Sequence, residues 1–178
     1  MRLVLAICVS VSAVACATAA ADIAPPAGFS PSAQLSKPAT FVAGKPAHVY
    51  CAATQAQFNQ ADQQYTGQVL GAGFSFIGGD QTFLSPWVCG FLTGWLQKHH
   101  VSEYHLAVAI ASLTHEAELE KGISDESIAD CKGLAIMPTV VKKFFPLRGI
   151  YTMHNLMRDA WDSHDGEPAV YLTNCPKR

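Results

Sequence analysis

The chain has 178 residues, a formal net charge of −2 and a hydrophobic content of 49%. This length suits one domain with its own hydrophobic core. The nearly balanced charge gives no indication of nucleic-acid binding or of a general attraction to anionic membranes, and we expect no nucleic-acid partner.

The N-terminus has the features of a removable signal peptide. Arg2 is followed by an apolar run that reaches Val9 and then by small residues that end at Ala21. A signal peptidase recognises this order, and the segment is too short to be a transmembrane span. We expect residues 1–21 to be removed and the protein to be secreted or held at the cell surface. A lipid anchor on Cys16 is the alternative.

The cysteines predict a disulfide-braced domain. The chain has six cysteines, and two of them lie in the predicted signal peptide. The others form no closely spaced pair of the kind that binds zinc, and an exported protein folds in an oxidising compartment. We therefore expect two disulfides, in a pairing that the sequence leaves open. The cysteines concerned are Cys51, Cys89, Cys131 and Cys175.

The first part of the remaining chain predicts a linker and the start of the domain. Residues 22–47 are rich in Pro, Ala, Ser, Gly and Lys, which predicts a flexible linker before a domain that covers residues 48–178. Residues 52–66 predict a helix that ends at Gly67. Aromatic and polar residues alternate around a Gly-Gly-Asp turn in 73–84, which predicts a short β-hairpin.

Two helices are predicted next. Ser85 and Pro86 favour a helix over residues 87–97, because serine caps a helix N-terminus and proline fits the first turn. The best-defined helix begins at Ser102 and ends at Gly122, with apolar residues that recur at helical spacing.

The C-terminal part predicts further helices. One begins at Ser124, and Pro138 divides it from a short helix that ends at Phe145. The connection before Ser124 is short, so this helix should pack antiparallel to the preceding one. A last helix over residues 150–161 and an extended segment over 169–172 follow. The sequence therefore predicts a mainly α protein with a small β component (α+β).

The dipeptide His115-Glu116 is a candidate for chemistry. It lies in the last third of the helix that ends at Gly122. Zinc hydrolases with a His-Glu-x-x-His helix bind the metal through two histidines one turn apart, and the glutamate activates the metal-bound water. Here the position one turn after His115 holds Leu119, which cannot bind a metal. Taken alone, the dipeptide is typical of a solvated helix surface.

A longer series of motifs surrounds the dipeptide. Between residues 49 and 175 the chain contains Gly-Phe-Ser-Phe, Leu-Ser-Pro-Trp-Val-Cys, Leu-Thr-His-Glu-Ala, Gly-Ile, Ala-Asp-Cys and Tyr-Leu-Thr-Asn-Cys, in that order. This series resembles a group of secreted bacterial proteins, common in actinobacteria, that are similar to zinc metallopeptidases of the zincin type. The resemblance implies a zincin-like helical core.

The resemblance also implies roles for particular residues. His115 would be a zinc ligand and Glu116 the general base, with Asp130, or Glu126 in its place, as an acidic ligand from the following helix. Leu119 occupies the place of the second histidine. The site then lacks one of the three protein ligands that hold a catalytic zinc ion.

Other residues are candidates for the missing ligand. Glu118 lies three residues after His115, a spacing at which two side chains can share a metal, and His105 or His154 would have to enter from elsewhere. We expect a secreted metallopeptidase-like protein with a degenerate, non-catalytic zinc site. An active site would hydrolyse peptide or amide bonds in an extracellular peptide or protein. The alternative is an extracellular, disulfide-stabilised binding module with an aromatic partner surface. Its candidate aromatic residues are Phe74, Phe76, Trp87, Trp95 and Trp161.

Overall fold

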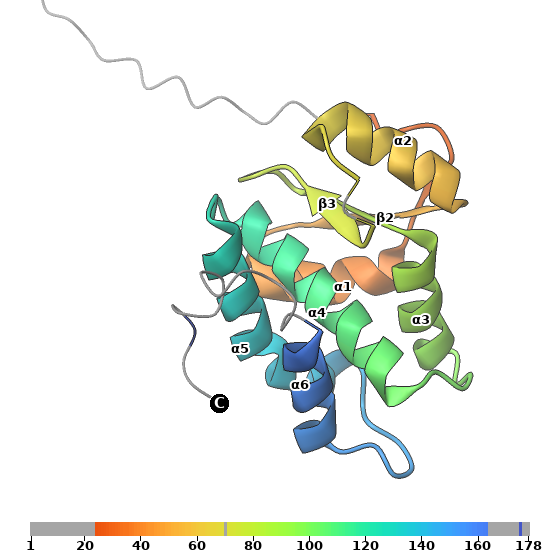
Figure 1. Ribbon diagram of the computed structural model, residues 1–178, viewed down its shortest axis with the longest axis vertical. Coiled ribbons are helices and arrows are strands. Elements are labelled where there is room, and N and C mark those ends of the chain that lie inside the picture. Colours follow the sequence, from red (N-terminus) through yellow and green to blue (C-terminus); the bar gives the residue numbers. More distant parts are fainter. Residues whose placement is uncertain (1–23, 70, 164–174, 176–178) are drawn as a thin grey trace, which may run out of the picture.

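The computed structural model describes residues 24–69, 71–163 and Cys175. The described chain is mainly helical with a small sheet, as the sequence predicts (Figure 1). The predicted signal peptide and the predicted extended segment 169–172 lie outside the described residues. The elements are β1 (Phe29–Pro31), α1 (Ala33–Ala43), β2 (His48–Ala52), α2 (Gln55–Thr66), β3 (Gly73–Ser75), β4 (Gln81–Leu84), α3 (Pro86–Leu96), α4 (Glu103–Glu120), α5 (Glu126–Phe144) and α6 (Met153–Asp162).

The strands form one mixed sheet in the order β1-β2-β4-β3. β2 and β4 run parallel, whereas β1 and β3 run antiparallel to their neighbours. The pairing of β3 with β4 confirms the predicted hairpin. α2 lies on one face of the sheet, and the other helices lie on the opposite side (Figure 1). Side chains alternate along a strand, so Phe83 packs in the small cluster with Phe58 of α2, while Leu84 belongs to the main core.

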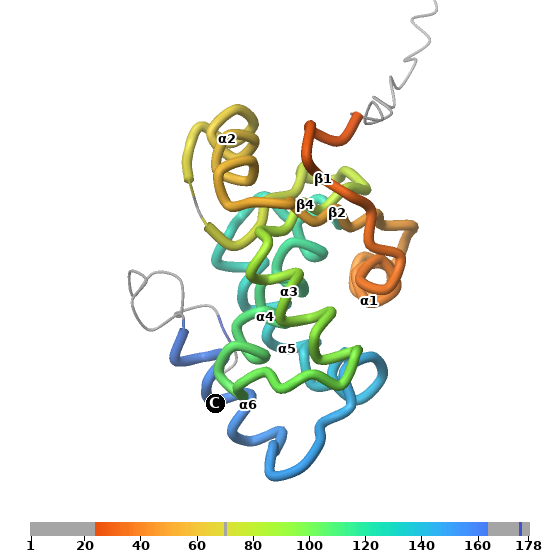
Figure 2. The backbone as a smooth tube through the Cα atoms, turned by 90° about the vertical axis from the view of Figure 1, so that its right-hand side faces the viewer, coloured from red at the N-terminus to blue at the C-terminus, as the bar shows by residue number. Residues whose placement is uncertain are grey.

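α4 is the central helix of the main core. It contacts α1, α3, α5, α6 and the strands β3 and β4, and Figure 2 shows it between α3 and α5 below the sheet. Leu106, Ile110 and Leu113 are fully buried at the predicted helical spacing. Ser102 caps the helix, because its Oγ accepts a hydrogen bond of 3.2 Å from His105 N. The prediction for this helix is confirmed.

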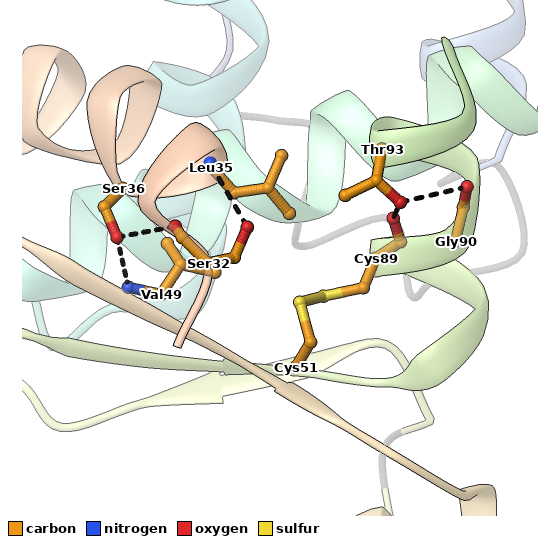
Figure 3. The surroundings of a disulfide bond; sticks show 8 residues. All are labelled: Ser32, Leu35, Ser36, Val49, Cys51, Cys89, Gly90 and Thr93. Atoms are coloured by element: carbon orange, nitrogen blue, oxygen red, sulfur yellow. Dashed lines mark hydrogen bonds between the residues drawn. A yellow bond between two sulfur atoms is a disulfide. The ribbon is translucent and has the colours of Figure 1, made fainter. Parts of the chain in front are cut away.

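The segment predicted to be a flexible linker, residues 22–47, is folded from Phe29 onward. β1 pairs with β2, and α1 begins after Ser32, whose side chain accepts a hydrogen bond from Leu35 N. The Ser36 hydroxyl then links α1 to β2, accepting a hydrogen bond of 2.9 Å from Val49 N (Figure 3). The linker prediction is therefore wrong, and the domain begins before residue 48.

Helical spacing explains why this segment folds despite its composition. Leu35, Ala39 and Val42 are buried in the main core and lie on one face of α1. Pro38 lies in the middle of the helix and is buried with them. Small residues on one face of α1 bury enough apolar surface to order the segment, because α4 provides a large apolar partner.

α5 differs from its prediction at both its start and its middle. Asp125 is the N-cap in place of Ser124, and its carboxylate accepts a hydrogen bond of 3.2 Å from Ile128 N. The helix continues through Pro138, so the predicted division there is wrong. Proline removes one backbone hydrogen bond, but Val141 beyond it is 1% exposed, and burial of this last part in the core keeps the helix continuous.

Two disulfides brace the domain, as predicted. Cys51 on β2 is bonded to Cys89 on α3 (Figure 3), and Cys131 on α5 is bonded to Cys175. This pairing resolves the alternatives that the sequence left open. Disulfides persist in oxidising compartments and indicate an extracellular environment. Within the described ranges, no helix is both long and apolar enough to cross a bilayer.

Candidate functional site

His115 lies between two carboxylates of α5. Its Nε2 is 3.0 Å from Glu126 Oε2, and its Nδ1 is 2.6 Å from Asp130 Oδ1. Both contacts are ion pairs when the imidazole is protonated. The predicted antiparallel packing brings these groups together, because His115 is near the end of α4 and both acids are near the start of α5.

These carboxylates favour the protonated form of His115. Burial of the ring lowers the pKa of His115, but Asp130 and Glu126 raise it, and the net pKa lies well above the ordinary value of histidine. A partly buried imidazolium with an acid beside each nitrogen is a paired charge, which a protein tolerates far better than an isolated one. The three side chains therefore link α4 to α5 electrostatically.

α5 also approaches α4 closely at this point. A Cβ atom on Gly133 would lie 2.9 Å from the backbone nitrogen of His115. A side chain does not fit at that distance, so glycine is required for the present spacing of the helices. The close approach holds Asp130, less than one helical turn before Gly133, beside the imidazole.

Glu116 does not share the environment of His115. Neighbouring helix positions are about 100° apart, and Glu116 lies beneath β3, where a Cβ on Gly73 would be 3.1 Å from its Oε1. It is 5% exposed. Burial raises the pKa of Glu116 to about 7, against the opposing effects of the His115 charge and a Ser75 hydrogen bond. The predicted general base is therefore a buried carboxyl group under the hairpin.

Glu120 is a second buried acid on the same face of α4. It lies one turn after Glu116, and its Oε1 accepts a hydrogen bond of 2.7 Å from the Thr82 hydroxyl of β4. Burial raises the pKa of Glu120 to about 7, while the bond from Thr82 lowers it. Sequence reasoning did not identify this residue as part of the site. The sequence signal that could have identified it is its spacing of four residues from Glu116, which places both acids on one face of the helix.

The surroundings of the other candidate ligands differ from those of His115. Glu118 is 2% exposed and forms an ion pair of 2.6 Å with Lys121. His105 pairs with Ser102 and stacks on the Phe91 ring at 4.5 Å. His154 is exposed in the first turn of α6. These contacts do not bring a replacement ligand to the place of the second histidine.

Leu119 occupies that place as a buried apolar residue. It is 5% exposed, and its carbonyl oxygen accepts hydrogen bonds from Gly78 N and Gly122 N. Within residues 24–69, 71–163 and 175, no three His, Cys, Asp or Glu side chains form a group that could hold a metal ion. Among the described residues, His115, Asp130 and Glu126 lie together but Leu119 adds no ligand, so this donor set lacks the second histidine of the zinc-peptidase motif.

Comparisons with known proteins leave the resemblance as a prediction. No family model matches the chain, and no match is found among curated proteins or solved structures. The assignment of a function therefore rests on the residues of this chain and their geometry.

The free energy of unfolding is expected to fall as the pH rises from about 5 to about 8. The folded-state pKa of Glu116, about 7, lies above the ordinary value of an unfolded glutamate. The folded state then binds more protons between these two values, so its stability decreases with rising pH through this window. Glu120 and His115 act in the same direction, because their folded-state pKa values are also raised.

The variant Glu116→Gln should flatten this pH profile. We expect it to remove up to about 3 kcal/mol of the decrease, at about 1.4 kcal/mol per pKa unit. Urea denaturation of both proteins at several pH values measures the difference. Parallel profiles for the two proteins would contradict a raised pKa at Glu116.

Proposed function

We propose that this protein is an exported, non-catalytic relative of zinc metallopeptidases, in which a proton on His115 stands where a peptidase would hold its metal. The observation that best supports this is the position of both His115 nitrogens beside carboxylates, at 3.0 and 2.6 Å. The imidazolium and its two acids then hold α4 and α5 together. The domain keeps its helix pair without requiring zinc.

Zinc binding would oppose this arrangement in two ways. A histidine ligand must be neutral, whereas the neighbouring acids raise the pKa of His115. Zinc would also have to separate Nε2 from Glu126 and draw three ligands together, although Leu119 supplies none. Glu116, which would activate the water in a peptidase, instead lies buried beneath β3.

The variant Leu119→His tests the proposal directly. A histidine one turn after His115 lies on the same helix face and would restore the missing ligand. We expect zinc affinity to rise by at least about 100-fold over the natural protein, which corresponds to roughly 2.7 kcal/mol. Calorimetric titration measures the affinity, and a zinc-dependent rise in Tm gives a second readout.

The control variant is Leu119→Gln, which removes the same apolar contact without adding an imidazole. It should bind zinc no better than the natural protein. Submicromolar zinc binding by the natural protein would show that the site is not degenerate. Failure of both the natural protein and the Leu119→His variant to bind zinc would contradict the relationship to zinc peptidases.

A binding module is the second candidate function, and a row of rings on α3 and α4 favours it. Trp87, Phe91, His105 and Tyr104 make successive ring contacts, with centroids 5.9, 4.5 and 5.8 Å apart. Tyr104 is 50% exposed. Amphipathic rings of this kind are enriched in protein interfaces. Binding of extracellular peptides that is lost in Tyr104→Ala would support this candidate.

The row differs from the aromatic surface predicted from the sequence. Phe74 and Trp95 are 3% and 5% exposed and belong to the two hydrophobic clusters. Phe76, Trp87 and Trp161 are partly buried. Among the predicted residues, only Trp87 therefore belongs to the row.

A further inference from the structure

The loop between α5 and α6 presents an exposed isoleucine. Tyr151 N donates a hydrogen bond of 3.3 Å to Arg148 O, which closes a tight turn with Gly149 and Ile150 at its centre. Gly149 has a φ of 65°, a conformation that glycine adopts without strain. Ile150 is 88% exposed, the largest exposed fraction among the large hydrophobic side chains of the described chain. We call residues 146–151 the tip loop.

The tip loop is held firmly on both sides of Ile150. The Arg148 guanidinium lies over the Trp95 ring, 3.9 Å from its centroid, and donates to the Trp95 carbonyl oxygen. Tyr151 stacks on the other side of the turn against the same Trp95 ring, and its hydroxyl donates a hydrogen bond of 2.6 Å to Val101 O. These contacts order the turn, and the ordered turn holds Ile150 in its exposed position. Figure 1 shows this loop at the end of the molecule remote from the sheet.

Lys98 is a further cationic residue close to the tip loop. Lys98 N donates to the same Trp95 carbonyl oxygen that Arg148 binds, so these two cationic residues are neighbours. Glu103, which accepts a hydrogen bond of 3.0 Å from Thr152 N, adds a negative charge nearby. Arg148 and Lys98 together exceed the charge of this carboxylate.

The last turn of α5 adds two more cations. Lys142 and Lys143 are both exposed and lie directly before the tip loop. Lys143 also lies 4.2 Å from the centroid of the Phe41 ring. Together with Arg148 in the tip loop and Lys98 beside it, they make four cationic residues in or next to this part of the chain.

We propose that this end of the protein docks on the surface of an anionic phospholipid bilayer, with Ile150 inserted at the headgroup boundary and the surrounding cations against the lipid phosphates. An exposed apolar side chain gains free energy when it leaves water, and each basic residue near an anionic membrane adds to the attraction. The rigid turn lowers the cost of binding, because the loop is already ordered before it meets the membrane. This docking is peripheral and independent of the proposed metallopeptidase ancestry.

Vesicle co-sedimentation tests the proposal. The protein is purified from the culture medium after export. Mass spectrometry verifies that the preparation begins at Asp22, so neither a signal peptide nor a lipid on Cys16 contributes to vesicle binding. We expect binding to equimolar phosphatidylglycerol and phosphatidylcholine vesicles and none to pure phosphatidylcholine. Binding should weaken strongly at about 1 M salt, where the Debye length is about 3 Å.

Variants separate the apolar contribution from the charge contribution. Ile150→Ser should weaken binding roughly tenfold, as expected for partial burial of an isoleucine, and Lys142→Gln with Lys143→Gln should weaken it at least about tenfold. Ile77→Ser is the matched control, because Ile77 is 55% exposed on the distant hairpin, and it should bind like the natural protein.

Three outcomes would overturn the docking proposal. The natural protein fails to bind anionic vesicles, it binds neutral vesicles equally well, or Ile150→Ser binds as tightly as the natural protein. Each substituted residue is exposed, so circular dichroism should show that each variant keeps the fold of the natural protein. A protein that binds zinc tightly yet still requires Ile150 for vesicle binding would contradict the proposed function and leave the docking proposal supported.

Discussion

Replacing Phe83 by alanine is expected to lower the free energy of unfolding by roughly 3–5 kcal/mol. The Phe83 ring is fully buried and forms the centre of the small cluster between the sheet and α2. Its centroid lies 4.9 Å from that of Phe74, 5.4 Å from that of Tyr50 and 5.5 Å from that of Phe29. Alanine would leave a cavity that none of these rings can fill without losing another contact.

Urea denaturation followed by circular dichroism measures this loss. Tyr104→Ala is a suitable control, because it removes an aromatic ring that is 50% exposed and should cost about 0.5 kcal/mol or less. Similar losses for the two variants would mean that the cluster beneath α2 does not contribute as a packed core. A changed denaturant slope would instead indicate that α2 unfolds separately from the main core.

Removing the disulfide between Cys51 and Cys89 is expected to cost about 4 kcal/mol. The bond closes a sequence separation of 38 residues, and opening it increases the conformational entropy of the unfolded chain. It also joins β2 to α3 next to the parallel pairing of Cys51 with Leu84. A typical domain has a total stability of about 5–15 kcal/mol, so this loss would remove a large share.

The double variant Cys51→Ala with Cys89→Ala is the appropriate protein, because it leaves no free thiol at either position. Equilibrium denaturation under non-reducing conditions compares it with the natural protein. Reduced natural protein serves as a second measure and should lose at least as much stability. A loss below about 1 kcal/mol would show that the unfolded chain is already restricted without the bond.

The sequence predicted the elements whose signals are local. α4 could be recognised because Leu106, Ile110 and Leu113 recur at helical spacing after a capping serine. The β-hairpin could be recognised from its aromatic alternation and its glycine turn. Both signals lie within one element or between neighbouring elements, where backbone geometry and burial act on nearby residues.

Elements that depend on distant partners were missed. α1 is short and carries Pro38, and its small apolar residues become a core face only when α4 covers them. β2 pairs in parallel with β4, so its partner is separated from it by α2 and β3. Neither relation is visible in the local sequence pattern. The composition of residues 22–47, taken alone, therefore suggested a linker.

In the candidate site, too, one part could be predicted from local sequence and another part could not. The short connection between α4 and α5 predicted that His115 would meet an acid of the next helix, and both Asp130 and Glu126 lie beside it. The burial of Glu116 and Glu120 under the hairpin was not predicted, because it depends on how the sheet crosses α4. The roles that the zincin resemblance implies remain predictions.

If the protein is exported as proposed, the place of α1 in the core affects how the chain folds as it crosses the membrane. Translocation delivers β1, α1 and β2 first, while α4, which covers the apolar face of α1, emerges later. Until then Leu35 and Val42 remain in contact with water or with whatever binds the emerging chain. We therefore expect the N-terminal third to fold only after α4 has emerged and to be open to proteases and aggregation until then.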